Sequence, residues 1–425
     1  MTEKIKAALT SLSPAAWKIR DEATESAELF FIRQILDMKR MTDVREYTVT
    51  VYVDKTDGEG KKMRGSSSVT LNPGTSDGEI REVLASAISA AGYALNPYFD
   101  LADPTTSPVL PDSSDLGALS VEEIAKKMAN ALFSVDTAAD AFVNSAEVFA
   151  IRKTVRILTS AGTDVGYVSS TVDGEFISQC KTDSADVETY DSFSYRSLDT
   201  AGLARAVANA LERVRDRALA RTGLPGGTYD VVLSDGLMRS LFSFYTDRAN
   251  VAMIYPGYSE YKIGEPVDRT GKGEQIDLTL VPTEPFSGDG IPMIRRKMID
   301  GGKLTSYHGP LPFCRYLGVE PTGDYTAIEL DNGSLPMAEL TAGKCLHVVA
   351  FSDFLTDEMT GHFGGEIRLA YLYENGKVTK ITGGSVNGSL LDASGELVFS
   401  KERYSDATYS GPRAVRIPGV SVAGA

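Results

Sequence analysis

Residues 361–384 read GHFGGEIRLAYLYENGKVTKITGG, and this stretch decides how we expect the C-terminal part of the chain to fold. Ile367, Leu369, Tyr371 and Tyr373 alternate with the residues between them, which is the pattern of a half-buried strand. Asn375-Gly376 follows, and this pair accepts the positive φ angles of a two-residue hairpin turn. The stretch therefore predicts a β-hairpin whose first strand starts at Glu366, with His362 in the glycine-rich turn before it.

His362 and Glu366 raise the question of a metal site. A zinc site needs three or four ligands arranged around the ion, and this stretch offers one histidine and one carboxylate. We therefore interpret His362 as a structural or solvated residue.

The composition excludes several classes of protein. A chain of 425 residues is too long for one core, so two or three domains are expected. The formal net charge of -15 argues against binding to nucleic-acid phosphates. Three widely spaced cysteines argue against a disulfide framework. The N-terminal residues lack an apolar signal core and no long apolar run occurs, so we expect a cytoplasmic protein without membrane spans.

The pattern of helices and strands predicts an α+β fold, because strands dominate the later part of the chain and helices are mixed with strands before it. We expect an N-terminal α+β region over 1–95, a linker or loop over 96–119, a middle α+β region with a long helix over 120–224, and a strand-rich domain over 225–425. The first of these would form an α/β sandwich-like domain.

Local signals define parts of this plan. Ser120 and Glu123 predict a capping box, and Asp199 predicts the cap of the long helix. Turns are expected at Gly162 and near Asp173-Gly174. The arginines of the long helix are read as a solvated face; they are Arg205, Arg213, Arg215 and Arg217.

Two cysteine–histidine pairs deserve consideration as catalytic groups. Cys345 and His347 would share one face of a strand, as a nucleophile and its base require. Their surroundings, CLHVVAF, are strongly apolar, which favours a core strand with a small buried cysteine. Cys314 with His308 is the second candidate pair.

Several stretches together resemble the TldD/PmbA family. They are TGHFGGEIRLAYLYENGKVTKITGGSVNG near the C-terminus, GGTYDVVLSDGLMRSLFSFY, and IDLTLVPTEP followed by DGIPMIRRKMIDGGKLTSYHGPLPFCRYLG. The resemblance is strong over 228–390 and weak before 120. It implies that the strand-rich domain is of the TldD/PmbA type.

The resemblance also separates two branches of that family. The TldD branch carries His-Glu-x-x-x-His on a helix and a C-terminal cysteine, which together hold zinc and activate water. Ser243, Phe244 and Arg248 stand at the matching positions here, and no cysteine follows Cys345. The chain thus resembles the TldE (PmbA) branch, which lacks the metal.

The resemblance implies a noncatalytic, TldE-like subunit of a cytoplasmic TldD/TldE-type zinc peptidase. A TldD-like partner would supply the zinc, this chain would hold no cofactor, and together they would enclose unfolded peptides. The family's description as modulators of DNA gyrase finds no support in a chain this acidic. The strand-rich domain would form most of the interface, and one stretch would line the chamber: Gly361, His362, Gly364, Gly365 and Glu366.

Two alternatives stay open at this stage. One is a self-standing, divergent hydrolase that uses Cys345 and His347. The other is a homodimeric peptide-binding or scaffold protein that has no catalytic partner.

Overall fold

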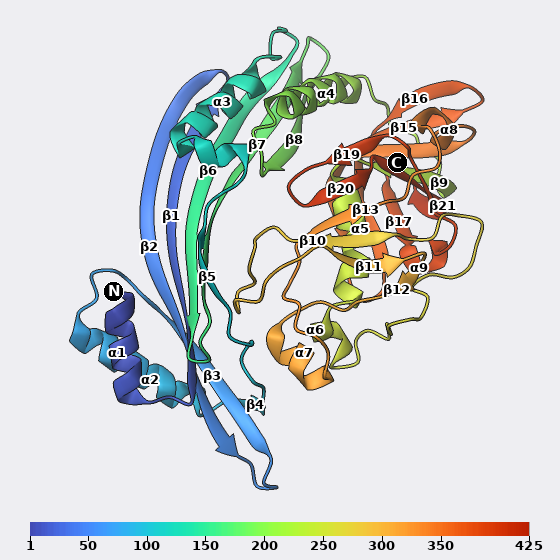
Figure 1. Cartoon of the computed structure of the whole chain (residues 1–425). Helices are drawn as coiled ribbons and strands as arrows, with labels where there is room; N and C mark the ends of the chain where they lie inside the picture. Colours follow the sequence, from blue (N-terminus) through green and yellow to red (C-terminus); the bar gives the residue numbers. More distant parts are fainter. Residues whose placement is uncertain (425) are drawn as a thin grey trace.

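The computed structural model describes residues 1–424 and confirms the α+β class (Figure 1). A long, curved sheet forms the N-terminal part, and a strand-rich C-terminal part lies against its concave side. Within residues 1–424, the longest apolar stretches in helices fall short of what crossing a membrane requires.

The N-terminal sheet has eight strands in the order β4-β3-β2-β1-β6-β7-β5, with β8 paired to β7. Its middle strand, β1, pairs with β2 on one side and with β6 on the other, both antiparallel. The β1–β6 pair therefore joins the expected regions 1–95 and 120–224 in one sheet. The strands are β1 (Ala16–Ile32), β2 (Ile35–Thr56), β3 (Lys62–Leu71), β4 (Leu95–Pro97), β5 (Thr106–Leu110), β6 (Ala141–Thr159), β7 (Asp164–Lys181) and β8 (Asp186–Tyr195).

Four helices cover one face of this sheet at its two ends (Figure 1). Helices α1 (Thr2–Leu12) and α2 (Asp77–Ala91) pack at one end, and α3 (Val121–Phe133) and α4 (Thr200–Ala218) at the other. The predicted caps are confirmed: Ser120 and Glu123 form a capping box, and Asp199 caps α4. A short 3-10 helix, η1 (Asp115–Ala118), lies within the predicted linker.

The opposite face of the sheet packs against the C-terminal part. Phe286 joins a buried cluster with residues of β6 and β7, and Leu311 joins another with Tyr52 and Phe99. Lys18 of β1 forms an ion pair with Asp289 at 2.5 Å across this contact. Further ion pairs join the two parts, among them Arg196–Glu284 and Lys380–Asp216, so apolar burial and several ion pairs hold them together.

The C-terminal part contains a seven-stranded sheet and a six-stranded sheet. In the first, β14, β9, β21, β17 and β15 form a closed ring, because β14 pairs with both β9 and β15. Its strands are β9 (Gly227–Ser234), β14 (Cys345–Thr356), β15 (His362–Glu374), β16 (Lys377–Ile381), β17 (Ser385–Ser389), β18 (Val398–Phe399) and β21 (Ala414–Ala423).

The second sheet runs β12-β11-β10-β13-β20-β19. Helix α5 contributes five side chains to the large core that both sheets share. The strands are β10 (Leu278–Val281), β11 (Arg296–Asp300), β12 (Lys303–Leu304), β13 (Ala327–Leu330), β19 (Arg403–Ser405) and β20 (Tyr409–Pro412); the helices are α5 (Leu237–Arg248), α6 (Val251–Ile254), α7 (Leu311–Leu317), α8 (Met337–Leu340) and α9 (Leu390–Ala393).

The predicted hairpin exists, but its first strand starts earlier than expected. Asn375 and Gly376 have φ angles of 53° and 73° and connect β15 to β16. Strand β15 begins at His362, so the prediction that His362 precedes the strand was wrong. The early start has a physical cause: residues 362–366 pair with β17, which follows the hairpin in sequence.

Two further local predictions were wrong. Asp173-Gly174 lies inside the continuous strand β7, because neighbouring strands on both sides supply its hydrogen bonds. The arginines of α4 are not simply solvated. Arg213 pairs with Asp191 of β8, and Arg215 pairs with Asp140, so they fasten the helix to the sheet.

Gly174 offers a test of packing within the long sheet. A Cβ atom at Gly174 would lie 2.3 Å from the Glu147 carbonyl oxygen and 2.4 Å from the Phe193 ring, whereas a Cβ atom at Gly58 would meet no atom within 4 Å. We expect Gly174→Ala to cost about 1–3 kcal/mol through overpacking. Thermal unfolding followed by circular dichroism should show a lowered midpoint for Gly174→Ala and little change for Gly58→Ala. Equal midpoints would contradict this packing.

Candidate functional site

Helix α5 carries the three positions that matched the metal motif in the sequence, and each side chain has a structural contact. Phe244 is buried in the core. The Ser243 hydroxyl donates a hydrogen bond to the Ser240 carbonyl oxygen at 2.8 Å. Arg248 donates to the Met359 carbonyl oxygen at 2.7 Å, and its guanidinium lies 4.9 Å from the centre of the Tyr261 ring. These positions therefore anchor neighbouring chain segments.

The loop between β14 and β15 rests on this end of α5. The Asp357 carboxylate accepts hydrogen bonds from the backbone and hydroxyl of Thr360, both at 2.7 Å, which fixes the loop as a tight turn. Gly361 has a φ of 69°, and a Cβ atom there would lie 3.1 Å from the Phe244 ring. Arg248 holds the loop from its other side through Met359.

A cavity of about 500 Å³ opens where the helix, the loop and strand β17 meet. It brings Asp247, near the end of α5, next to His362 and Gly364, two of the residues singled out in the sequence. Gly365 and Glu366 are not part of its lining. The lining residues are Asp247, Leu355, Thr356, Asp357, Glu358, His362, Phe363, Gly364 and Asn387.

Four of these residues have no signal in the sequence that marks a site. Asp247 and Asn387 lie 140 positions apart in the numbering, and only the closure of the strand ring brings them to one cavity. Leu355 and Glu358 stand at the end of β14 and in the loop after it. No spacing rule connects these residues before the strand pairing is known.

The glycines of β15 have a different physical role from the one expected. A Cβ atom at Gly364 would lie 2.6 Å from the Val386 carbonyl oxygen, and one at Gly365 would lie 2.2 Å from the Asp353 carbonyl oxygen. Residues 363–365 also pair with β17 on one side and β14 on the other. The close approach that these glycines permit is therefore between strands of this chain, and β15 has no free edge here.

The electrostatics of the cavity are acidic. Burial, followed by the charge of Glu358, raises the pKa of Asp247 to about 6, against a smaller opposing effect of Arg239. Hydrogen bonds from Thr360 lower the pKa of Asp357. His362 is exposed, and its Nδ1 lies 3.1 Å from the Thr360 hydroxyl. Asp247 is thus a carboxyl whose charge depends on pH near neutrality.

The arrangement offers no evident cation site. Among residues 1–424, no group of three or more histidine, cysteine, aspartate or glutamate side chains is placed to hold a metal ion. The guanidinium of Arg248, at the position of the second motif histidine, would also repel a cation. The residues present therefore do not fit the zinc site of the family motif.

The Cys345–His347 pair does not form a catalytic dyad. The Cys345 sulfur lies 3.4 Å from the Thr341 carbonyl oxygen in a buried cluster, whereas His347 Nε2 lies 3.0 Å from the Ser234 hydroxyl. Burial raises the pKa of the Cys345 thiol and lowers the pKa of His347 to about 4. A raised thiol pKa is the opposite of what a nucleophilic cysteine requires.

The Cys314–His308 pair is structural too. His308 Nε2 lies 2.9 Å from the Thr246 carbonyl oxygen, and the Cys314 sulfur lies 3.7 Å from the Gly309 carbonyl oxygen. Both side chains are buried, and burial lowers the pKa of His308 to about 4. The pair braces the end of α5 against the segment before α7.

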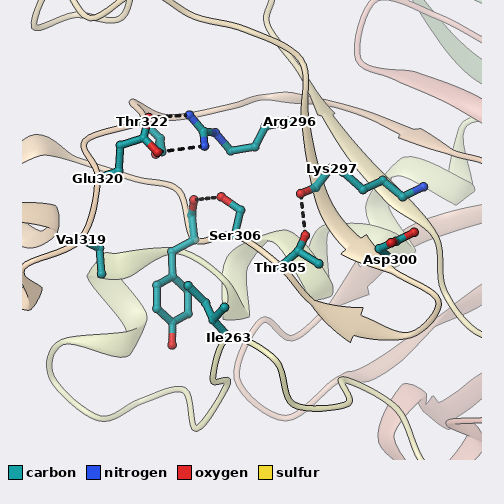
Figure 2. A pocket seen from close by; sticks show the side chains of 10 residues that line it. Ile263, Arg296, Lys297, Asp300, Thr305, Ser306, Val319, Glu320 and Thr322 are labelled. Atoms are coloured by element: carbon teal, nitrogen blue, oxygen red, sulfur yellow. Dashed lines mark hydrogen bonds and ion pairs between the residues drawn. The ribbon is translucent and has the colours of Figure 1, made fainter.

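A second cavity, of about 400 Å³, lies beside β11 (Figure 2). Its basic side chains already have acidic partners: Arg296 pairs with Glu320, and Lys297 pairs with Asp331. Thr305 and Ser306 donate to backbone carbonyl oxygens, as Figure 2 shows. Because these polar groups satisfy each other, we assign no ligand to this cavity.

Comparisons with known proteins agree with the fold and the sequence resemblance. Residues 226–424 match the PmbA/TldA metallopeptidase C-terminal domain. The C-terminal part of the chain therefore belongs to the TldD/PmbA family. No curated protein matches it in sequence.

Three solved structures share the fold over the full length of this chain. TldE from Thermococcus kodakarensis matches with a TM-score of 0.79 at 15% identity, with 100% of both chains covered. A protein from Bacteroides thetaiotaomicron, named as a candidate modulator of DNA gyrase, matches with a TM-score of 0.80 at 19% identity, covering 100% of this chain and 99% of its own. A protein from Thermotoga maritima with the same description matches with a TM-score of 0.79 at 16% identity, with 100% of both chains covered.

Asp247 predicts a specific pH dependence of stability. A carboxyl whose pKa is raised on folding stabilises the protein below its unfolded pKa and loses that contribution as the pH rises through about 6. The side chain of Asp247→Asn does not ionise, so the variant does not lose this stability as the pH rises. Between pH 4 and pH 7.5 the variant should gain about 1–2 kcal/mol relative to the unmodified chain, a value reduced for partial solvent screening.

Urea unfolding at several pH values measures this difference. Asp186→Asn serves as a control of opposite sign, because hydrogen bonds from Gln179 and Lys181 lower the pKa of Asp186. Removing the Asp186 carboxylate should lower the free energy of unfolding more at neutral pH than at low pH. If the free energy of unfolding changed with pH in the same way for Asp247→Asn and the unmodified chain, the partly buried, acidic setting of Asp247 would be contradicted.

The three cysteines give a second prediction. All are free and buried, and burial raises the pKa of each thiol. A thiol-specific disulfide reagent at pH 8 should therefore react slowly with the native chain and should titrate three thiols after unfolding in guanidinium. Fast labelling of Cys345 in the native chain, located by peptide mass spectrometry, would restore the Cys345–His347 hydrolase hypothesis.

Proposed function

We propose that this chain is the noncatalytic, TldE/PmbA-like subunit of a TldD/TldE-type zinc metallopeptidase of the cytoplasm. A metal-bearing partner of the same family would supply the zinc and the water-activating glutamate. This chain would hold unfolded peptide beside that metal. The proposal rests on one observation. The side chains of Ser243, Phe244 and Arg248 on α5 are all used in contacts within this chain.

The chemistry of these three side chains explains why no catalysis is assigned to the chain itself. A zinc peptidase needs imidazole ligands and a carboxylate base within reach of a bound water. Phe244 is buried under the loop after β14, and Arg248 holds that loop by a hydrogen bond. The positions that would bind metal therefore maintain the wall of a cavity.

The cavity has features that suit an extended peptide. Leu355, at its edge, is 68% exposed and offers an apolar contact, while Asp247 and Glu358 offer acceptors for amide or ammonium groups. Because β15 is paired on both sides here, the peptide would contact side chains in the cavity instead of adding a strand to β15. His362 and Gly364 would lie beside it.

The proposal predicts the behaviour of the chain alone and in a complex. Elemental analysis of the purified chain should find no stoichiometric zinc, and the chain alone should leave an unstructured peptide uncut. Mixed with a family member that carries His-Glu-x-x-x-His, it should support zinc-dependent cleavage of that peptide. One tightly bound zinc per chain, or cleavage by the chain alone, would refute the noncatalytic role.

A matched pair of variants tests the cavity. Asn387 is exposed in the cavity, and Asn96 is exposed in β4, in the N-terminal sheet. We expect Asn387→Arg to raise the KM of the reconstituted complex at least fivefold and Asn96→Arg to leave it unchanged. If both variants retain the original KM, with binding to the partner intact, the cavity does not hold the peptide.

A further inference from the structure

The cavity between α5 and the loop after β14 is acidic over part of its lining. The lining includes three carboxylates, those of Asp247, Asp357 and Glu358, and it includes neither a lysine nor an arginine. Asp357 is occupied, because it accepts hydrogen bonds from the backbone of Met359 and of Thr360. Within residues 1–424, the side chains of Asp247 and Glu358 form no hydrogen bond or ion pair, so both carboxylates are available to a ligand.

The basic side chains of α5 are bound elsewhere. Arg239 has the smallest of the three effects on the pKa of Asp247, and its guanidinium donates to the Thr326 carbonyl oxygen at 2.9 and 3.2 Å. The guanidinium of Arg248 donates to the Met359 carbonyl oxygen on the other side of the loop. Neither arginine therefore neutralises the carboxylates of the cavity.

The two available carboxylates disfavour each other. Burial of Asp247 and the nearby charge of Glu358 raise the pKa of Asp247 to about 6. Like charges held close together without a counter-ion cost free energy, and a cation bound between them offsets that cost. Charged groups that a fold retains at a cost to its own stability are typical of binding sites.

Another part of the lining is apolar. Leu355, at the end of β14, is 68% exposed, and Phe363 of β15 also lines the cavity. Lysine and arginine side chains combine an apolar stem, which packs on apolar surface, with a cation at the tip. A cavity of about 500 Å³ lies within the size range of ligand pockets, so it accommodates such a side chain.

Other classes of side chain match this lining less well. A glutamate or aspartate of the peptide would add a further like charge to the cavity. An apolar side chain would cover Asp247 and Glu358 and leave both without a partner, and burying an unpaired charge is costly. The lining therefore discriminates between peptide side chains by their charge.

We propose that this cavity binds a lysine or arginine side chain of the extended peptide. Asp247 and Glu358 accept hydrogen bonds from its cation, and Leu355 contacts its apolar stem. This inference rests on the proposed function, because it takes the peptide to lie in this cavity. It adds that the noncatalytic subunit selects peptides by one basic residue.

Three unstructured peptides that differ at one position test the selectivity. That position holds lysine, norleucine or glutamate, and norleucine has a similar stem without the ammonium group. In the reconstituted complex, the lysine peptide should have a KM about fivefold below that of the norleucine peptide, because only lysine forms charge-assisted hydrogen bonds with the carboxylates. The glutamate peptide should have the highest KM of the three.

Variants of this chain separate its selectivity from any preference of the partner. Asp247→Asn/Glu358→Gln keeps the size of both side chains and removes both charges, so the KM values of the lysine and norleucine peptides should then differ less than about twofold. Glu339→Gln is the matched control. Glu339 is an exposed residue of α8 outside the cavity lining, and this variant should keep the difference of about fivefold.

Isothermal titration calorimetry with this chain alone measures the same preference without catalysis. The lysine peptide should bind about fivefold more tightly than the norleucine peptide, and Asp247→Asn/Glu358→Gln should bind the two alike. Circular dichroism of each variant confirms that it is folded.

These measurements separate the inference from the proposed function. Zinc-dependent cleavage with equal KM values for the lysine and norleucine peptides would leave the proposed function standing and overturn the inference. A preference for lysine that persists in Asp247→Asn/Glu358→Gln would also overturn it, because the preference would then belong to the partner. If the complex cleaves no peptide, the proposed function fails, and calorimetry decides the charge selectivity. Equal binding of the lysine and norleucine peptides, or no binding of either, would overturn the inference there.

Discussion

The divided pairing of strand β15 is the constraint on which the C-terminal part depends. Residues 370–374 pair with β16, while residues 362–366 pair with β17, and β14 lies along the other side of both halves. Strands β16 and β17 both run antiparallel to β15, and Gly383 and Gly384, with φ angles of 83° and 81°, form the kink between them. Because the chain continues past this kink along β15, β17 lies between β15 and β21 and closes the ring of five strands.

The ring in turn positions the candidate site. It carries the loop after β14 onto the end of α5, where Gly361 meets Phe244 and Met359 meets Arg248. The same closure brings Asn387 of β17 to the cavity. At the positions that the sequence resemblance matched to a metal motif, helix α5 bears the buried ring of Phe244 and the hydrogen-bonded guanidinium of Arg248. Contacts from these two side chains hold the loop after β14, which forms one wall of the cavity. Neither side chain is a ligand for a metal ion.

The N-terminal sheet shows how one architecture serves two surfaces. One of its faces carries four helices, and the other packs against the C-terminal part through Phe286, Leu311 and the Lys18–Asp289 ion pair. With both faces largely used, the edge of β2 is what stays free. The apolar side chains exposed along this edge contribute little to either core.

Local chemistry made much of the fold readable from the sequence. Asn375-Gly376, the Ser120–Glu123 capping box and the Asp199 cap depend on near neighbours, and all three are as predicted. Residue identity alone also predicts, through the resemblance, that Ser243, Phe244 and Arg248 stand at the positions of the TldD branch's metal motif, and this stays a prediction. Long-range pairing decided the rest. It extended β15 back to His362, carried β7 straight through Asp173-Gly174, and used the glycines of β15 for contacts within the chain. It also brought Asp247 and Asn387 to the same cavity. The sequence does not predict this, because hydrogen bonds between strands distant in sequence leave no periodic pattern in either segment.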